Sequence, residues 1–139
     1  AVGLGVIMDT FETAITWDKF DALHARVVQA ARDAAETKAL VSCRITHAYP
    51  DGAAPYFTVV APARADGELS QWLAVKTAIT DAMLAEGGTT THHHAVGRDF
   101  RPWYEQQVPT LLRSSLEAVK RQLDPSSILN PGVLLPEAD

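Results

Sequence analysis

Three consecutive histidines, His92, His93 and His94, are the residues of this chain whose type and spacing best suit chemistry. Histidine changes its charge near neutral pH, so it can take up and release protons under physiological conditions. The triplet follows two glycines and three threonines, a polar run that suits a site better than a core. In an extended segment neighbouring side chains point to opposite sides, so the three imidazoles cannot easily bind one metal ion. We therefore weigh a functional cluster without a metal against a solvated loop.

Two tyrosines and one more histidine could join this cluster. His47 and Tyr49 fall on the apolar face of a segment with strand periodicity, and Tyr56 begins the segment that returns after a turn. A functional interpretation requires that this hairpin lie near the histidine triplet. The alternative is a half-buried aromatic edge whose polar tips are in water. The sequence leaves both open.

Charged residues and the one cysteine give weaker signals. Arg98 and Arg101 flank Asp99 just after the histidines. Most such charges are solvated, although an arginine beside a catalytic loop could hold a phosphate or carboxylate group. Cys43 occupies an inward position of its strand, which indicates packing and not a nucleophile.

The elements that would position these residues follow from periodicity and from helix-end signals. Alternation and helical spacing predict, in order, a strand at Leu4–Met8, a helix from an N-cap at Thr16 to Thr37, a strand at Leu40–Tyr49, a turn at Pro50–Pro55 and a strand at Tyr56–Ala61. The second half predicts a helix at Leu69–Met83 with Gly87 as its left-handed C-cap, a strand starting at Thr89–Thr91, a short helix at Pro102–Gln106, a helix from Pro109 to Leu123 and an extended tail.

This order of elements predicts an α+β fold. Strand, helix, strand, strand, helix, strand is the order of a ferredoxin-like, split βαβ unit, an antiparallel sheet with both helices on one face. Its other face is free to cover a partner domain. We expect residues 1–100 to form this unit and residues 101–139 to form C-terminal helices and a docked tail.

Composition limits the classes of function. The 139 residues are 47% apolar and carry a formal charge of −5, which suits one globular domain and argues against binding to nucleic acid or to an anionic membrane. A single cysteine excludes an internal disulfide and fits a reducing, cytoplasmic compartment. Because the chain starts at Ala1 and moves straight into an apolar segment, we expect a piece of a longer polypeptide.

Four segments together resemble one known family. They resemble the C-terminal end of FAD-linked oxidases of the vanillyl-alcohol-oxidase superfamily, most of all its alkyldihydroxyacetonephosphate synthase branch: DTFETAITW (9–17), SCRITHAYPDGAAPYF (42–57), GGTTTHHHAVGRD (87–99) and LDPSSILNPGVLL (123–135). In the D-lactate and glycolate dehydrogenase branch one expects HAGDGNLH in the hairpin, and Gly-Glu where His92 and His93 stand here. Ala95 departs from the glycine expected in the synthases.

The resemblance implies a cofactor, a partner and roles for particular residues. FAD would be the cofactor, and an FAD-binding N-terminal domain of the same protein would be the partner that this cap domain covers. Tyr56 and the three histidines would be catalytic, with His94 and Asn130 also contacting the cofactor and Arg98 binding substrate. A small or lipid-like substrate is expected, with no nucleic acid, and both a homodimer and peripheral contact with a membrane stay open.

The implied activity is the exchange of an acyl for an alkyl group on dihydroxyacetone phosphate in ether-lipid synthesis. The first alternative is an FAD-dependent dehydrogenase or oxidase of a 2-hydroxy acid such as D-lactate or glycolate. The second alternative is a ferredoxin-like binding module without catalysis.

Overall fold

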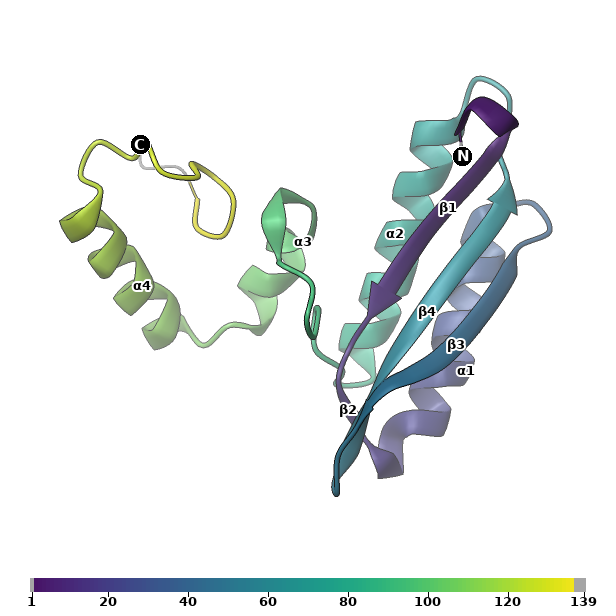
Figure 1. The fold of residues 1–139 in the computed structure, drawn as a ribbon, viewed down its shortest axis with the longest axis horizontal. Helices are drawn as coiled ribbons and strands as arrows, with labels where there is room; N and C mark the ends of the chain where they lie inside the picture. Colours follow the sequence, from purple (N-terminus) through teal and green to yellow (C-terminus); the bar gives the residue numbers. More distant parts are fainter. Residues whose placement is uncertain (1, 137–139) are drawn as a thin grey trace. The chain divides into compact units, whose positions relative to one another are not determined.

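The computed structural model describes residues 2–136, which form two compact units (Figure 1). The sheet unit comprises Ala1–His93, and the C-terminal unit comprises His94–Asp139. The boundary expected between residues 100 and 101 falls inside a helix, so the segment that follows the histidines belongs with the C-terminal helices.

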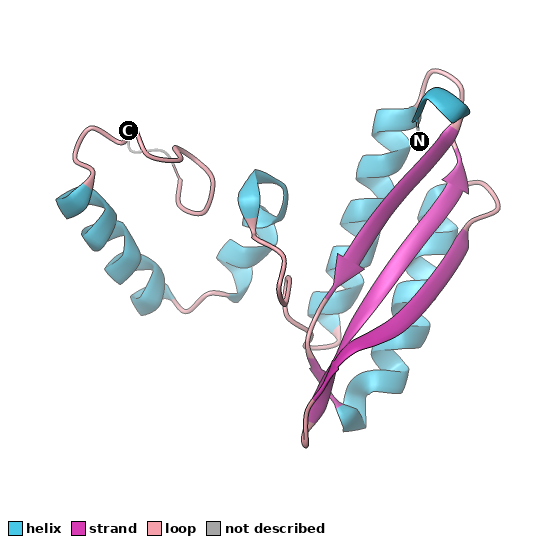
Figure 2. Cartoon of the chain, viewed as in Figure 1, coloured by secondary structure: helices cyan, strands magenta, loops and turns pink. Residues whose placement is uncertain are grey.

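The sheet unit is the α+β, ferredoxin-like arrangement that the order of elements predicted. Its central strand β4 pairs antiparallel with β1 and β2 along one edge and with β3 along the other. Both helices cover the same face of the sheet (Figures 1 and 2). The elements are a 3-10 turn at Val2–Leu4, β1 (Val6–Glu12), β2 (Ile15–Thr16), α1 (Trp17–Ala35), β3 (Leu40–Ala48), β4 (Gly52–Pro62) and α2 (Glu68–Ala85).

The core lies between the two helices and the sheet. Its largest fully buried side chains are Phe11 and Phe57 from neighbouring strands, Leu23 from α1, and Ile79 and Met83 from α2. Each large apolar side chain buried in this way stabilises the fold by roughly 1.5–3 kcal/mol. The helix-facing residues of the strands alternate with residues that face away, so the unit presents one face without helices.

Two strand boundaries differ from the prediction. β1 begins at Val6, after the 3-10 turn, and runs to Glu12. The predicted turn at Pro50–Pro55 is shorter, because β4 already begins at Gly52. That glycine is required: a Cβ there would lie 2.4 Å from the carbonyl oxygen of Ile15 on the paired strand β2.

The strand predicted to start at Thr89–Thr91 does not form, although the segment contacts Glu12 at the end of β1 and the two residues that follow it. One backbone hydrogen bond, from the Thr89 N–H to the Ala14 carbonyl oxygen at 3.1 Å, joins the two segments, and side-chain hydroxyls supply further contacts. The Thr13 hydroxyl donates to the Thr89 carbonyl oxygen at 2.6 Å, and the Ala14 N–H donates to the Thr89 hydroxyl at 2.8 Å. Gly87, with φ of +83°, caps α2 as predicted.

The C-terminal unit contains α3 (Gly97–Gln107) and α4 (Thr110–Leu123), followed by the tail. The predicted start of α3 at Pro102 is wrong, because a full turn precedes the proline; α4 begins just after Pro109 and ends before Pro125, as predicted. None of the residues of either helix is buried. Within residues 2–136, no helix combines the length and the apolar character that crossing a membrane requires.

Candidate functional site

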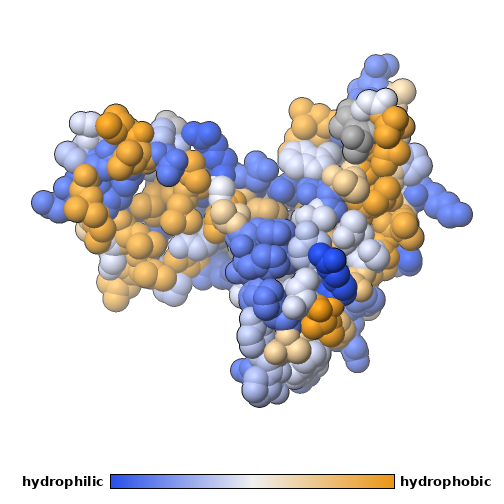
Figure 3. Space-filling view, viewed as in Figure 1, coloured by the Kyte–Doolittle hydropathy of each residue, from blue (hydrophilic) through white to orange (hydrophobic). Residues whose placement is uncertain are grey.

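The helix-free face of the sheet carries a row of polar side chains across three strands. Residues that oppose each other in an antiparallel pair project to the same side, and the register pairs Tyr56 of β4 with Glu12 of β1 and with Arg44 of β3. Because Phe57 is buried under the helices, Tyr56 projects from the opposite face. Figure 3 views the sheet unit from this side and shows hydrophilic residues, interrupted by a small apolar patch, over the lower part of the sheet.

A β-bulge brings His47 onto this face. Between Ile45 and His47 the register shifts, so Ile45 opposes Pro55 and His47 opposes Ala54. Such a bulge inserts one extra residue, here Thr46, and reverses the alternation beyond it. Strict alternation predicts that His47 projects from the same face of the sheet as Ile45. Because of the bulge, it projects from the face of Arg44 and Tyr56.

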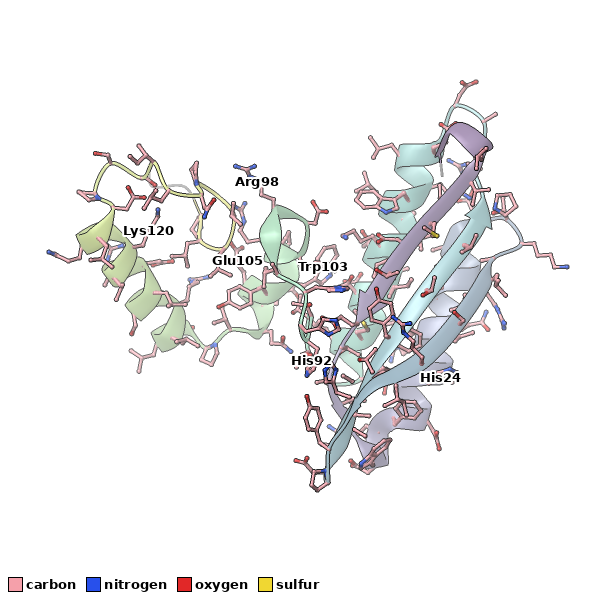
Figure 4. The ribbon with its side chains drawn as sticks, viewed as in Figure 1. His24, His92, Arg98, Trp103, Glu105 and Lys120 are labelled. Atoms are coloured by element: carbon pink, nitrogen blue, oxygen red, sulfur yellow. The ribbon has the colours of Figure 1, made fainter. Side chains whose placement is uncertain are left out.

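The hairpin and the histidine segment meet in the sheet unit. The Tyr49 hydroxyl lies 3.0 Å from Nε2 of His92, and the ring of His47 lies 4.9 Å from that of His92 and 5.4 Å from that of His93. Tyr56 stacks on His93 with ring centroids 6.2 Å apart. Figure 4 shows His92 beside the end of β1. We refer to His47, Tyr49, Tyr56, His92 and His93 as the histidine–tyrosine cluster. The hairpin therefore lies near the histidine segment, as the functional interpretation of these residues requires.

A buried carboxylate, that of Glu12, supports the cluster and was missed by the sequence analysis. Its side chain is 1% exposed and pairs with Nδ1 of His93. It also accepts hydrogen bonds from the Thr91 hydroxyl at 3.2 Å, from the His92 N–H at 3.1 Å and from the His93 N–H. An acidic residue on the face without helices is ordinarily solvated, so only the segment DTFETAITW hinted at it.

Two cluster neighbours have different roles. The Arg44 guanidinium lies 4.6 Å from the centre of the Tyr56 ring, a cation–π contact that places positive charge beside the phenol. Cys43 points toward the helices, and burial raises the pKa of its thiol, partly offset by a backbone hydrogen bond from Tyr56. A thiol with a raised pKa is a poor nucleophile, which agrees with a packing role.

The other predicted site residues belong to the C-terminal unit. His94 is its first residue. Arg98, labelled in Figure 4, donates to the Pro131 carbonyl oxygen at 2.8 Å. Arg101 donates to that of Gly132 at 2.8 Å, so both arginines hold the tail. Asn130 has a φ of +47° and lines a cavity of about 220 Å³ between the end of α4 and the tail.

A second carboxylate, Asp124, shapes the turn that leads to Asn130. It pairs with Lys120 and accepts the N–H groups of Ile128 and Leu129 at 3.1 and 2.9 Å. The hydrogen bond from Lys120, followed by the one from Leu129, lowers the pKa of Asp124, although burial opposes this.

Comparisons with known proteins agree with this architecture. The family described as "FAD linked oxidases, C-terminal domain" matches residues 1–134. The chain is 32% identical over 130 residues to the alkyldihydroxyacetonephosphate synthase of Caenorhabditis elegans, covering 89% of this chain and 22% of that protein. It is 34% identical over 133 residues to the synthase of Trypanosoma brucei brucei, covering 92% and 21%. The chain belongs to the family of C-terminal domains of FAD-linked oxidases.

A solved alkyldihydroxyacetonephosphate synthase shares the fold, with a TM-score of 0.66, 18% identity and coverage of 91% of this chain and 20% of that one. The chain thus spans about a fifth of the length of the curated relatives it matches. The resemblance stated from the four segments is confirmed at the level of the family.

Proposed function

We propose that this chain is the cap of an FAD-dependent enzyme that exchanges an acyl for an alkyl group on dihydroxyacetone phosphate. The observation that carries the proposal is the histidine–tyrosine cluster, which joins Tyr56 of the hairpin to the histidines after α2. These residues lie in the segments that resemble the synthase branch, and two synthases more than 30% identical to the chain match most of its length.

The donor set of the sheet unit fits FAD. The cluster offers flat phenol and imidazole rings together with O–H and N–H donors, and the flavin ring is a planar heteroaromatic group with carbonyl and ring-nitrogen acceptors. The rings of His47 and His93 are partly open to solvent on a face without helices. His94 and Asn130, in the C-terminal unit, are proposed as further cofactor contacts. When bound, FAD supplies an electron-accepting ring that is unchanged at the end of the exchange.

The chain's own residues would move protons and hold charge. In the net reaction an acyl-dihydroxyacetone phosphate and a fatty alcohol give the alkyl ether and a free fatty acid. A base must take a proton from the carbon that bears the ester and return it after the fatty carboxylate has left that carbon. The alcohol must lose its own proton as the ether bond forms, which balances the release of the fatty acid. His92 and His93 suit these transfers, and Tyr56 suits an acid–base relay because its hydroxyl can both donate and accept. Arg98 is proposed as a contact for the substrate's phosphate.

The test uses the full-length protein that contains this chain, purified with its flavin and given an acyl-dihydroxyacetone phosphate and an isotope-labelled fatty alcohol. We expect labelled ether, one fatty acid released per ether formed, and oxidised flavin at the end. Replacing Tyr56 by Phe should lower kcat by about 10²–10⁴-fold, the range for a general acid–base group. Tyr104→Phe, in α3, is the matched control and should leave kcat unchanged.

Two other outcomes would reject the proposal. Flavin bleached by D-lactate or glycolate, without ether formation, would assign the protein to the 2-hydroxy acid dehydrogenases. A purified protein without any bound flavin would reject both enzyme functions.

A further inference from the structure

We propose that Glu12 is a positioning residue that acts through His93. By holding Nδ1 of that imidazole, its carboxylate fixes which ring nitrogen exchanges the proton in the reaction. The inference rests on the proposed function to the extent that His93 takes part in proton transfer.

The burial of Glu12 calls for an explanation. A carboxylate taken out of water is unfavourable unless charged or hydrogen-bonding groups replace the lost solvent. Four of its partners come from one short segment: the Thr91 hydroxyl, the backbone N–H groups of His92 and His93, and the His93 ring. The carboxylate therefore shapes the histidine segment at the place where the fold would otherwise put a strand.

The contact with the ring has a chemical consequence. A neutral imidazole carries one N–H, and the partner of one nitrogen decides which nitrogen that is. A carboxylate is only an acceptor, so it favours hydrogen on Nδ1 of His93 and makes Nε2 the nitrogen that accepts and returns a proton. It also stabilises the imidazolium that forms after the ring accepts a proton.

The groups that face His93 from the other strands do not duplicate this role. They are Tyr56 from β4, His47 and, over Tyr56, Arg44 from β3, with His92 as the neighbour in the segment. None of these four groups of the sheet unit is a carboxylate. Glu12 therefore brings a carboxylate to the cluster that these groups do not supply.

Asp9 provides a matched comparison on the same strand. Its carboxylate accepts the Trp72 indole N–H at 2.7 Å and lies 3.9 Å from Nζ of Lys76, on the face covered by the helices. These contacts attach β1 to α2 and lie on the opposite face of the sheet from the histidines. Loss of Asp9 should therefore affect stability without affecting proton transfer.

The experiment is a double-mutant cycle in the full-length, FAD-loaded protein. Glu12→Gln keeps the shape of the side chain but removes its charge and adds an N–H donor that opposes the Nδ1–H tautomer. We expect kcat to fall at least about 10–100-fold, the range for losing a carboxylate that orients a metal-bound histidine, with KM changed by less than about threefold. Asp9→Asn should leave kcat unchanged. In a His93→Ala background, Glu12→Gln should lower kcat no further.

A readout independent of activity is the tautomer of His93, followed by ¹⁵N shifts of labelled imidazoles and assigned by their loss in His93→Ala. The Nδ1–H form should dominate in the neutral ring of the wild-type protein and decline in Glu12→Gln. If Glu12→Gln fails to fold or to retain flavin, Glu12→Asp replaces it: its shorter carboxylate should lower kcat, and the loss should again vanish without His93.

Several results would overturn the inference. If Glu12→Gln lowers kcat as much in the His93→Ala background as in the wild-type protein, Glu12 does not act through His93. Wild-type kcat in folded Glu12→Gln, or in the Glu12→Asp replacement, would show that it does not act at all. If the wild-type protein forms no ether but reduces its flavin with a 2-hydroxy acid, the proposed function fails, while the same cycle on the rate of flavin reduction still tests Glu12.

Discussion

The two units of the chain keep their shapes by different means. In the sheet unit, α1 and α2 bury Leu23 and Ile79 completely against the sheet. In the C-terminal unit no residue of α3 or α4 is buried, and Leu111 and Leu123 remain 79% and 77% exposed. The first unit has a core of its own. The second is organised by side chains that bind its backbone.

The side chains in question form hydrogen bonds with the backbone of the tail. Arg98 and Arg101 bind carbonyl oxygens of the Pro131–Gly132 turn, and Asp124 binds the backbone before it. Such bonds fix the course of the chain without burying apolar surface. The family resemblance implies that the exposed leucines pack toward an FAD-binding domain, and this stays a prediction.

Two leucines in helices test the contrast most directly. Leu23→Ala in α1 removes a fully buried side chain and should lower the free energy of unfolding by about 2–5 kcal/mol, because it leaves a cavity. Leu123→Ala in α4 removes a side chain that is 77% exposed and should change it by less than about 0.5 kcal/mol. Urea denaturation of the 139-residue chain measures both.

The same pair in the full-length protein sharpens the comparison. If the C-terminal leucines pack toward another domain, the cost of Leu123→Ala should rise toward that of Leu23→Ala. Equal, small effects of Leu123→Ala in the chain and in the full-length protein would contradict that packing. A small effect of Leu23→Ala would contradict the core itself.

The sequence predicted best those elements that bury apolar side chains. Periodicity predicted α1, α2 and the hairpin because each buries one stripe or one face, and burial is what periodicity records. It also predicted α4, whose apolar stripe is real although no core in the described chain covers it. The ferredoxin-like order followed from these elements.

The details of the site did not follow, for physical reasons. A bulge at Thr46 reverses the alternation that assigned His47 to the wrong face. Threonine hydroxyls and the Glu12 carboxylate replace the strand expected at Thr89–Thr91. Both depend on contacts between residues far apart in the sequence, which local patterns do not contain. The histidine triplet was noticed because three consecutive histidines are unusual, and Tyr56 received its role from the family resemblance. Glu12 was missed because a single acidic residue on a strand is ordinary.

The lowered pKa of Asp124 predicts that acid loosens the C-terminal unit. A carboxyl group whose pKa is lower in the folded chain stabilises the fold fully above its unfolded value, about 3.9, and this contribution is lost as the pH falls through the lower folded value. Amide exchange of Ile128 and Leu129, whose N–H groups bind Asp124, should therefore accelerate, relative to the intrinsic rate, below a pH of about 4.

Asp124→Asn should remove this acid dependence. Glu117→Gln, which breaks the more exposed pair with Arg113 on the same helix, is the control and should retain it. The amides of Ile128 and Leu129 should be compared over roughly two pH units below pH 5. If they exchange at the same rate in the wild-type protein and in Asp124→Asn over that range, the carboxylate does not hold the tail.

The smallest expected effect is that of removing metal ions. Ring nitrogens of His47, His92 and His93 come within 4.8 Å of one another, close enough to share an ion, so the proton-transfer interpretation has a direct competitor. However, Nε2 of His92 is hydrogen-bonded to Tyr49, and Nδ1 of the same ring is shielded from solvent. To bind a metal, His92 would have to release Tyr49 or expose Nδ1, whereas proton transfer uses the arrangement as it stands.

We therefore expect dialysis of the full-length enzyme against a strong chelator to leave kcat and the melting temperature unchanged, with no zinc or manganese detected by elemental analysis. Loss of activity that added zinc restores would reassign the cluster as a metal site. Tyr49→Phe distinguishes the two further: it should weaken the positioning of His92 in a proton-transfer cluster, but strengthen zinc binding if that hydroxyl competes with a metal for Nε2.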